Sequence, residues 1–349
     1  MSLLKISNLN YNIKDKEILK KINLESNEGG ITCVLGPSGC GKTTLLKLIS
    51  GLLKIQEGEI LLNNKIISSQ KIHQKTEKRN IGFLFQEYAL FPHLTVEENL
   101  YFAIQKQKNK KEIIDDILGI IKLLDTKTRY PHELSGGEQQ RIALARSIIA
   151  KPTLLLLDEP FSNLDLNLKE EIRDDTLHLL QRFNISAIVV THDPFEAMFM
   201  SNTIYIMDKK GSIVQSGTPK DLYNNPNNSY VAEFFGETNK FKGIVKNSVV
   251  ITPIGNIPVK NMNELEEVDV HIRPHAVELK EEETPVNGIK GTVMTSKLIG
   301  PSSLVHLSVL GNNNEIIHVH SKMPSNFLPK ESSAVSINID TSQIFIFPK

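Results

Sequence analysis

The chain has 349 residues, of which 40% are hydrophobic, 23% charged and 6% aromatic, and at roughly 150 residues per domain this length predicts two domains. Lys plus Arg and Asp plus Glu both total 40, so the formal net charge is zero. A neutral chain argues against nucleic acid or another polyanion as the main partner.

No segment predicts a membrane span or a secretion signal. The longest aliphatic run, Leu154–Leu157, is far shorter than the roughly 20 apolar residues of a spanning helix. Residues 1–12 lack a basic leader with a long apolar run and a cleavage site, so we expect a cytoplasmic chain. The two cysteines, Cys33 and Cys40, are too few for a disulfide framework and lack metal-ligand spacing, which predicts packing roles.

The first element with recognisable chemistry is a phosphate-binding loop. An apolar strand is predicted at 31–36, residues 36–44 read GPSGCGKTT, and a helical pattern begins at Lys42. This is the pattern of a glycine, four residues, Gly-Lys and a hydroxyl residue, in its expected place between a strand and a helix. Its glycines let backbone N–H groups and the helix N-terminus surround phosphate oxygens; they are Gly36, Gly39 and Gly41.

Side chains of the same loop complete the predicted nucleotide site. Lys42 supplies a mobile charge for the β- and γ-phosphates, and Thr43 offers its hydroxyl to Mg²⁺. We assign the remaining loop residues to the nucleotide as well, namely Pro37, Ser38, Cys40 and Thr44. A catalytic role for the Cys40 thiol is less favoured than a filler position, because nothing in the sequence identifies a base for it.

Strand-like segments alternate with helical patterns through about residue 235, which predicts an α/β core. The unbroken apolar runs within it indicate strands buried on both faces. A polar, Lys-rich helical region interrupts the strands from Glu87 and predicts a helical subdomain over about 87–150. Its cluster Lys106–Lys111 is interpreted as a solvated helix end or loop in preference to a contact patch.

Within this region, residues 134–141 read LSGGEQQR and predict a second phosphate-binding helix N-terminus. Ser135, Gly136 and Gly137 precede a helix that runs through Ala150, so their N–H groups suit a γ-phosphate. One nucleotide does not need both loops from one chain. We therefore expect two chains to associate head to tail, each presenting this loop to the nucleotide of the other.

The apolar run at 154–157 continues into Asp158 and Glu159, and predicts a buried strand that ends in two acids. Asp158 is the candidate carboxylate on the Mg²⁺ side. Glu159, expected on the opposite face of an extended backbone, is the candidate general base that polarises the attacking water. A strand that merely ends in acidic turn residues is disfavoured by the phosphate-binding loop in the same chain.

With these motifs, the first 235 or so residues strongly resemble the ATP-binding subunit of an ABC transporter. The resemblance implies a P-loop NTPase fold with a helical subdomain, ATP and Mg²⁺ as cofactors, and a homodimer of ATPase subunits. It also implies ATP hydrolysis that drives two separate membrane permease subunits from the cytoplasmic face of the cell membrane, with an extracytoplasmic solute-binding protein as indirect partner.

The resemblance carries over to further residues in the expected order. It implies that Gln86 senses Mg²⁺ and water, that residues 162–165 cross the dimer interface, and that His192 contacts the γ-phosphate. Ile13 stands where an aromatic ring normally stacks on adenine, with Tyr11 two residues earlier. Either adenine meets an aliphatic face at Ile13, or a small register shift brings Tyr11 to it.

The segment after Gln86 places three apolar residues around Pro92: Leu90, Phe91 and Leu94. In the family such a segment lines the cleft that receives a permease helix. For any single residue, packing in the core of the helical subdomain is an equally good interpretation. For the segment as a whole, the partner groove is favoured.

After Glu237, helical periodicity stops and short β-rich runs follow one another, which predicts a small all-β barrel or sandwich. We expect an ATPase domain at 1–237 and a β-rich regulatory domain at 238–349. The latter resembles the OB-like, TOBE-type accessory domain of importer ATPases for iron(III), polyamines, sugars and small oxyanions. Loose similarities favour the ferric-iron branch, with polyamine import second and sulfate, molybdate or sugar import behind; they lie at 130–137, 234–241, 254–259, 272–279 and 343–348.

His318 and His320 alternate on one face of a predicted strand, so a regulatory metal site is conceivable. No spacing fixes a ligand set, and we expect solvated or hydrogen-bonded histidines and no metal beyond Mg²⁺. A different class, a soluble ABC-type ATPase acting on ribosomes or DNA, would carry tandem cassettes or a long coiled-coil insertion. Neither is present, and the fused membrane helices of exporters are also absent.

Overall fold

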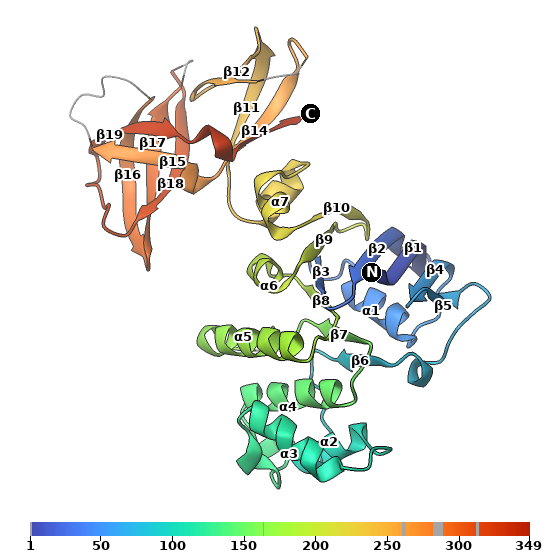
Figure 1. Cartoon of the computed structure of the whole chain (residues 1–349). Helices are drawn as coiled ribbons and strands as arrows, with labels where there is room; N and C mark the ends of the chain where they lie inside the picture. Colours follow the sequence, from blue (N-terminus) through green and yellow to red (C-terminus); the bar gives the residue numbers. More distant parts are fainter. Residues whose placement is uncertain (1, 163, 260–262, 282–288, 312–313) are drawn as a thin grey trace. The chain divides into compact units, whose positions relative to one another are not determined.

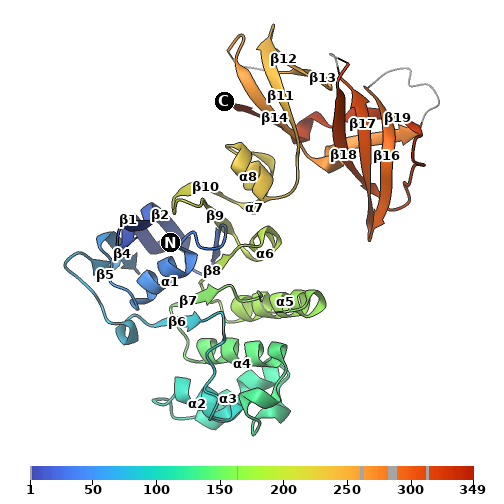
Figure 2. The same cartoon turned by 180° about the vertical axis from the view of Figure 1, so that it is seen from behind.

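A computed structural model of the chain describes residues 2–162, 164–259, 263–281, 289–311 and 314–349 (Figures 1 and 2). These residues form two compact units, Met1–Pro219 and Lys220–Lys349. Among the described residues, no helix is both long enough and apolar enough to cross a membrane.

The first unit is built on a six-stranded sheet in the order β10-β9-β3-β8-β7-β6. All neighbours are parallel except β10, which runs antiparallel to β9. The carboxyl ends of the parallel strands therefore meet at one edge, where α/β proteins bind their ligands. The strands are β3 (Ile31–Leu35), β6 (Ile81–Leu84), β7 (Leu154–Asp158), β8 (Ala187–Thr191), β9 (Thr203–Met207) and β10 (Ile213–Gly217).

Both faces of this sheet are buried, as the unbroken apolar runs predict. Leu154 and Leu156 of β7 face helix α1 (Lys42–Ser50), whereas Leu155 and Leu157 face α4 (Gly136–Ile149) and α5 (Leu166–Arg182). An antiparallel sheet in the order β2-β1-β4-β5 packs on the α1 side. Its strands are β1 (Ser2–Ile13), β2 (Lys16–Asn27), β4 (Glu57–Leu62) and β5 (Lys65–Ser69).

A helical region lies between β6 and β7 and contains α2 (Val96–Ala103), α3 (Lys110–Ile120) and α4. Thr95 and Glu98 form a reciprocal capping box that fixes the start of α2. The buried amide of Asn99 donates to the backbone oxygens of Phe91, Leu94 and Thr95, and so shapes the loop before α2. In the cluster 106–111, the side chains of Lys106, Lys108 and Lys111 are exposed.

A buried arginine holds the end of α1. Arg79 is 2% exposed, and its guanidinium donates to the carbonyl oxygens of Leu48 (3.1 Å) and Ile49 (2.7 Å) and to the Ser68 hydroxyl (2.7 Å). Burial lowers the pKa of Arg79 to about 10, so it is still a cation at neutral pH. Arg79 thereby ties the helix of the phosphate-binding loop to the segment that leads into β6.

Replacing Arg79 by methionine is expected to destabilise the protein, because the last carbonyls of α1 lose buried donors. Each unsatisfied buried group costs about 1–3 kcal/mol, so we expect the free energy of unfolding to fall by roughly 2–4 kcal/mol. Urea denaturation measures it. Lys78→Met, at an exposed neighbouring position, is the control and should change stability by less than about 0.5 kcal/mol. Equal stability of the two variants would contradict the role of Arg79.

The second unit contains two five-stranded antiparallel sheets that share one apolar core, in the orders β13-β12-β11-β14-β20 and β15-β19-β16-β17-β18. The first comprises β11 (Asn239–Lys246), β12 (Val249–Thr252), β13 (Gly255–Pro258), β14 (Glu267–Ile272) and β20 (Ile344–Pro348). The second comprises β15 (Val277–Glu281), β16 (Ile289–Ile299), β17 (Ser302–Leu310), β18 (Ile316–Pro324) and β19 (Ala334–Ile339).

Two short helices, α7 (Pro219–Asn224) and α8 (Ser229–Phe234), precede these sheets. The guanidinium of Arg273 donates to the carbonyl oxygens of Tyr223 (3.2 Å) and Ala232 (3.3 Å), so both helices pack with the second unit. The division expected at 237/238 marks the change from helix to strand, between α8 and β11. The compact unit itself begins at Lys220.

Histidines gather on one face of the second sheet. His306 and His320 are directly opposite in β17 and β18, and their rings stack with centroids 4.2 Å apart. The Nδ1 of His318 lies 3.2 Å from the sulfur of Met294. Burial, and then the neighbouring His320, lower the pKa of His306. Across the described residues, no group of three or more His, Cys, Asp or Glu side chains is arranged to hold a metal ion.

Candidate nucleotide-binding site

The loop between β3 and α1 has the backbone of a phosphate cradle. Gly39 and Gly41 have φ of +80° and +106°, values that side chains rarely allow. A Cβ on Gly36 would lie 2.9 Å from the Met207 carbonyl oxygen, so only glycine fits there. Gly41 caps α1 without a side-chain hydrogen bond from any described residue, which leaves the first N–H groups of the helix for a ligand.

Lys42 lies at the centre of this loop and is 4% exposed. Its Nζ donates to the carbonyl oxygens of Gly36 (2.8 Å) and Pro37 (3.0 Å). The same nitrogen is 3.8 Å from Oε1 of Glu159. A bound phosphate would therefore meet a cation that the loop already positions.

Thr43 and Asp158 come together from the loop and from the end of β7. The Thr43 hydroxyl donates to Oδ1 of Asp158 at 2.9 Å. Burial raises the pKa of Asp158, the hydrogen bond from Thr43 opposes this, and the charge of Glu159 adds to it. A buried carboxylate beside a hydroxyl favours a nearby cation. Hydroxyl and carboxylate oxygens are hard ligands of the kind that Mg²⁺ takes, with substrate phosphates and water completing its shell.

Glu159 follows directly, but not in the extended backbone that the sequence suggests. Its φ is +44°, so the chain turns sharply after Asp158, and its N–H donates to the Val190 carbonyl oxygen at 3.0 Å. The turn places Oε2 of Glu159 3.1 Å from Nδ1 of His192, which follows β8. Glu159, His192 and Lys42 therefore meet at the carboxyl edge of the sheet.

A charged network lies beside His192. Lys169 of α5 donates to Asp193 (2.6 Å) and Glu196 (2.7 Å), and the Thr191 hydroxyl donates to Glu196. Asp193 and Glu196 belong to the first turn of α6 (Pro194–Met200), where Asp193 is the cap. Sequence reasoning missed this network. Its other members lie 22 to 27 positions after Lys169 in the chain, and only the helix-capping pattern after His192 hints at the network.

Gln86 and the segment after Glu159 also approach each other. The Gln86 amide donates to the Ser162 hydroxyl at 3.4 Å, and that hydroxyl donates to the Glu159 carbonyl oxygen at 3.0 Å. Asp165 caps α5 by accepting from the Leu168 N–H at 3.0 Å, and Leu164 is half-buried. Asn163, the remaining member of the expected interface loop, lies outside the described residues.

Ser135 begins α4 but does not join the site of its own chain. Its hydroxyl accepts from the Glu138 N–H (3.3 Å) and donates to the Glu138 carboxylate (2.8 Å), which forms a capping box. Gly136 faces open space, whereas a Cβ on Gly137 would lie 2.8 Å from Ile172. Among the described residues, no hydrogen bond or ion pair links 135–137 to the loop 36–44.

The remaining predicted residues differ in accessibility. Ile13, at the end of β1, is 48% exposed, whereas Tyr11 is half-buried against the core around α1. Ser38 and Gly39 are exposed, and Thr44 is half-buried in the first turn of α1. Cys40 is buried, and burial raises the pKa of its thiol, so it is poorly suited to act as a nucleophile.

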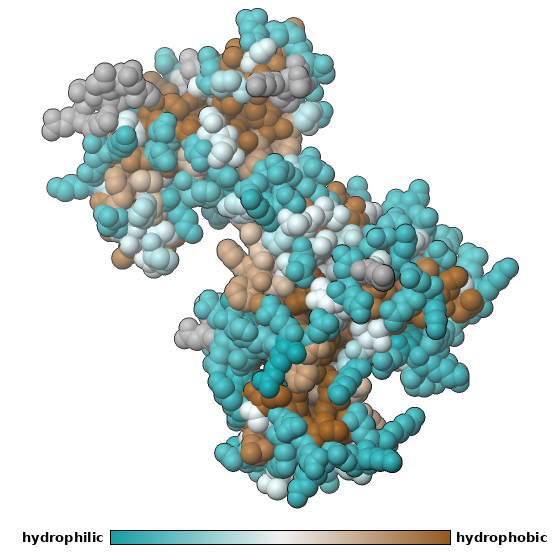
Figure 3. Space-filling model, in the orientation of Figure 1, coloured by the Kyte–Doolittle hydropathy of each residue, from teal (hydrophilic) through white to brown (hydrophobic). Residues whose placement is uncertain are grey.

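An apolar surface lies over the helical region, where brown side chains gather around α2 and α4 (Figure 3). Phe102 and Tyr101 are about half exposed. Phe91 packs edge-on against Phe102 with centroids 4.8 Å apart, and the Arg146 guanidinium lies 5.4 Å from the Phe91 ring. Leu90 and Leu94 are half-buried beside it.

Comparison with known proteins shows which family the chain is similar to. The family model described as ABC transporter matches residues 19–162. An Fe(3+) ions import ATP-binding protein of Fusobacterium nucleatum is 38% identical over 99% of this chain and 93% of its own length. A spermidine/putrescine import ATP-binding protein of Acetivibrio thermocellus is 38% identical over 99% and 97%. A sulfate/thiosulfate import ATP-binding protein of Shewanella oneidensis is 37% identical over 90% of both chains.

Solved structures of ABC transporter ATP-binding proteins are similar to the first unit in fold. cbiO1 from Clostridium perfringens, part of the ABC transporter complex cbiONQ, superimposes with a TM-score of 0.58 and 31% identity, over 64% of this chain and 91% of that one. A dimeric ATP-binding cassette in a post-hydrolysis state, bound to ADP and Pi, gives 0.55 and 30% over 62% and 99%. The P-loop α/β fold with its helical region, followed by an all-β unit, is thereby confirmed. The chain belongs to the ATP-hydrolysing ATP-binding proteins of ABC transporters.

Proposed function

We propose that this protein is the ATP-hydrolysing subunit of an importer that carries ferric iron through separate permease subunits. ATP hydrolysis is supported by one observation. The side chains of Lys42, Asp158, Glu159 and His192 meet at the carboxyl edge of the sheet. The likeness over nearly the whole chain to an iron(III) import protein supports the cargo class, and the short similarities at 234–241, 254–259 and 272–279 favour iron within it.

The loop residues 36–44 hold the ATP phosphates, with Lys42 as the mobile charge. Thr43 and Asp158 hold Mg²⁺, which when bound spreads the charge of the β- and γ-phosphates. Glu159 accepts the proton of the attacking water. His192 orients the Glu159 carboxylate, because its Nδ1 lies 3.1 Å from Oε2 of Glu159. Gln86 lies beside Ser162, next to the Glu159 turn, and is suited to sense the ion and the water. Adenine rests against the exposed face of Ile13.

Two chains associate head to tail, and Ser135, Gly136 and Gly137 of one chain face the γ-phosphate in the other. In support, no hydrogen bond or ion pair among the described residues links this loop to the loop 36–44 of its own chain, and Gly136 faces open space. ATP closes the dimer only through tighter binding to the closed state, and hydrolysis reopens it.

The permease subunits dock on the surface around Leu90, Phe91 and Leu94, whose partly exposed apolar side chains suit a helix of another chain. In this arrangement the protein works as a peripheral subunit at the cytoplasmic face of the cell membrane. A solute-binding protein on the other side delivers the cargo. The β-rich unit, with its two sheets around one core, is a TOBE-type regulatory domain.

A polyamine is the second candidate cargo, because the polyamine import protein is equally similar. Uptake of labelled iron(III) and of labelled spermidine in cells that lack the gene separates the two. We expect the wild-type gene to restore iron uptake, the inactive variant Glu159→Gln to restore none, and spermidine uptake to be unaffected. Restored spermidine uptake with unchanged iron uptake would replace iron by a polyamine, and no restoration of either would reject both cargoes.

A further inference from the structure

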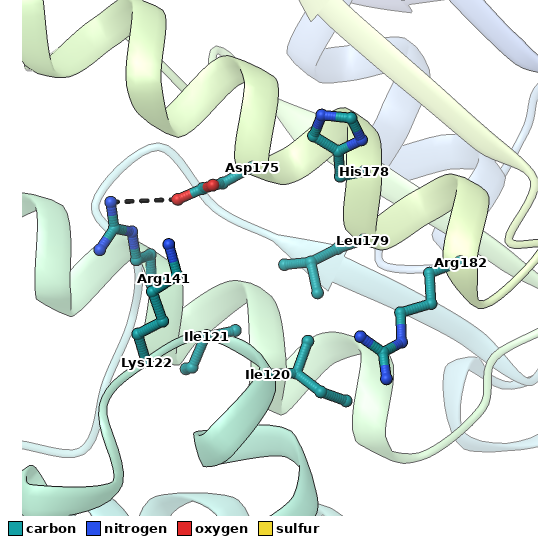
Figure 4. A pocket seen from close by; sticks show the side chains of 8 residues that line it. All are labelled: Ile120, Ile121, Lys122, Arg141, Asp175, His178, Leu179 and Arg182. Atoms are coloured by element: carbon teal, nitrogen blue, oxygen red, sulfur yellow. Dashed lines mark ion pairs between the residues drawn. The ribbon is translucent and has the colours of Figure 1, made fainter.

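A cavity of about 140 Å³ is lined by residues of α4 and α5 and of the end of α3, and by no residue of the loop 36–44 (Figure 4). Ile120 and Ile121 at the end of α3 and Leu179 of α5 form its apolar wall. Ile121 and Leu179 belong to the core around α4, so this wall is fixed. An apolar cavity of roughly 150 Å³ holds one benzene molecule, which sets the size of ligand that fits.

Cationic side chains border this apolar wall on both sides. In Figure 4, Lys122 and Arg141 lie on one side and Arg182 on the other, with the apolar residues between them. Arg141 pairs with Glu171 (2.5 Å) and Asp175 (3.0 Å), yet its Nε is buried and has no acceptor among the described residues.

The other basic side chains that line the pocket have no partner among the described residues. The side chains of Lys122, His178 and Arg182 form no hydrogen bond or ion pair with any residue in the part of the chain that the structure describes. Lys122 also has φ of +58°, just after α3, where glycine or asparagine is the favoured residue. The lysine is therefore not explained by the backbone of this helix end.

We propose that this pocket is a regulatory site for a small organic dianion. Two acidic groups would meet the cations on the two sides, and a short apolar chain would lie on Ile120, Ile121 and Leu179. Arg141 is in the second turn of α4, the helix that begins with the Ser135–Gly137 loop. An occupant that joins α3 and α4 to α5 restrains this loop, so it lowers the rate of ATP hydrolysis.

The test is titration of the whole protein with succinate by calorimetry at low salt, with saturating ADP and Mg²⁺ so that the phosphate loop is filled. We expect saturable binding of one succinate per chain. Butyrate, with a single acidic group, and inorganic phosphate, without an apolar chain, should bind at least tenfold more weakly. Equal binding of butyrate or phosphate, or no binding of succinate, would overturn the proposal.

The variant Lys122→Asn with Arg182→Gln removes two charges at exposed positions, and asparagine suits the backbone at 122. We expect at least a tenfold loss of succinate affinity. Lys108→Asn with Lys111→Asn also removes two positive charges, at exposed positions at and just before the start of α3, and should bind as wild type. An equal loss in Lys108→Asn with Lys111→Asn would indicate a general charge effect and would reject the site.

Succinate should also lower ATP turnover of the wild type by at least twofold and leave the Lys122→Asn, Arg182→Gln variant unaffected. Binding without this difference would reject the regulatory role. Because binding is measured directly, failure of the site is distinct from failure of the proposed import function.

Discussion

Replacing Glu159 by glutamine is expected to nearly abolish ATP hydrolysis and to preserve ATP binding. A general base contributes roughly 10²–10⁴-fold to a reaction rate, so we expect turnover to fall by at least about 10²-fold. The amide keeps the size of the side chain and leaves Lys42, Thr43 and Asp158 in place. With hydrolysis blocked, ATP should hold the two chains together, and size-exclusion chromatography should detect a stable dimer.

Glu28→Gln makes the same chemical change at an exposed position and serves as the control, with turnover and oligomeric state expected to match the wild type. Phosphate release in single-turnover experiments separates hydrolysis from product release. Wild-type hydrolysis in Glu159→Gln would remove the base from our proposal, and a loss of ATP binding would show that Glu159 serves the phosphate cradle.

Replacing Lys42 by alanine is expected to weaken ATP binding itself. The ammonium lies inside the loop, and hydrogen bonds to charged groups are worth about 1.5–3 kcal/mol, which corresponds to a roughly 10- to 150-fold loss of affinity. Equilibrium titration with a fluorescent ATP analogue measures it. Turnover falls in consequence, in contrast to Glu159→Gln, in which binding is retained.

The matched control is Lys54→Ala, which removes an exposed lysine shortly after α1. Thermal unfolding of both variants is needed, because Lys42 also donates to the Gly36 and Pro37 carbonyl oxygens. If Lys42→Ala binds ATP as well as Lys54→Ala does, the phosphate cradle has been assigned to the wrong residues.

The sequence predicts those parts of the site that are continuous in the chain. The loop 36–44, the acids at 158–159 and His192 each follow an apolar run, and parallel strands bring the ends of such runs to one edge. The α/β core and the family were predictable for the same reason. The left-handed turn at Glu159 was not, because glutamate rarely adopts it and no glycine marks it.

Contacts between positions far apart in the chain could not be predicted from the sequence. Arg79 contacts the end of α1, about 30 positions earlier, and Lys169 pairs with Asp193, 24 positions later. No local sequence pattern predicts either contact. The compact unit that begins at Lys220 includes α7 and α8, which precede the division expected at 237/238. Its first residues are helical like those before them, and only the packing of Arg273 against α7 and α8 assigns them to it.

The capping box at the start of α4 has a consequence for the energetics of dimer closure. In the single chain, the Ser135 hydroxyl already donates its hydrogen bond to the Glu138 carboxylate at 2.8 Å. In the head-to-tail dimer that we propose, that hydroxyl can donate to a phosphate only by giving up this bond, so closure would exchange one hydrogen bond for another. The net gain from such an exchange is about 1 kcal/mol or less, which keeps the closed dimer readily reversible once the γ-phosphate is gone.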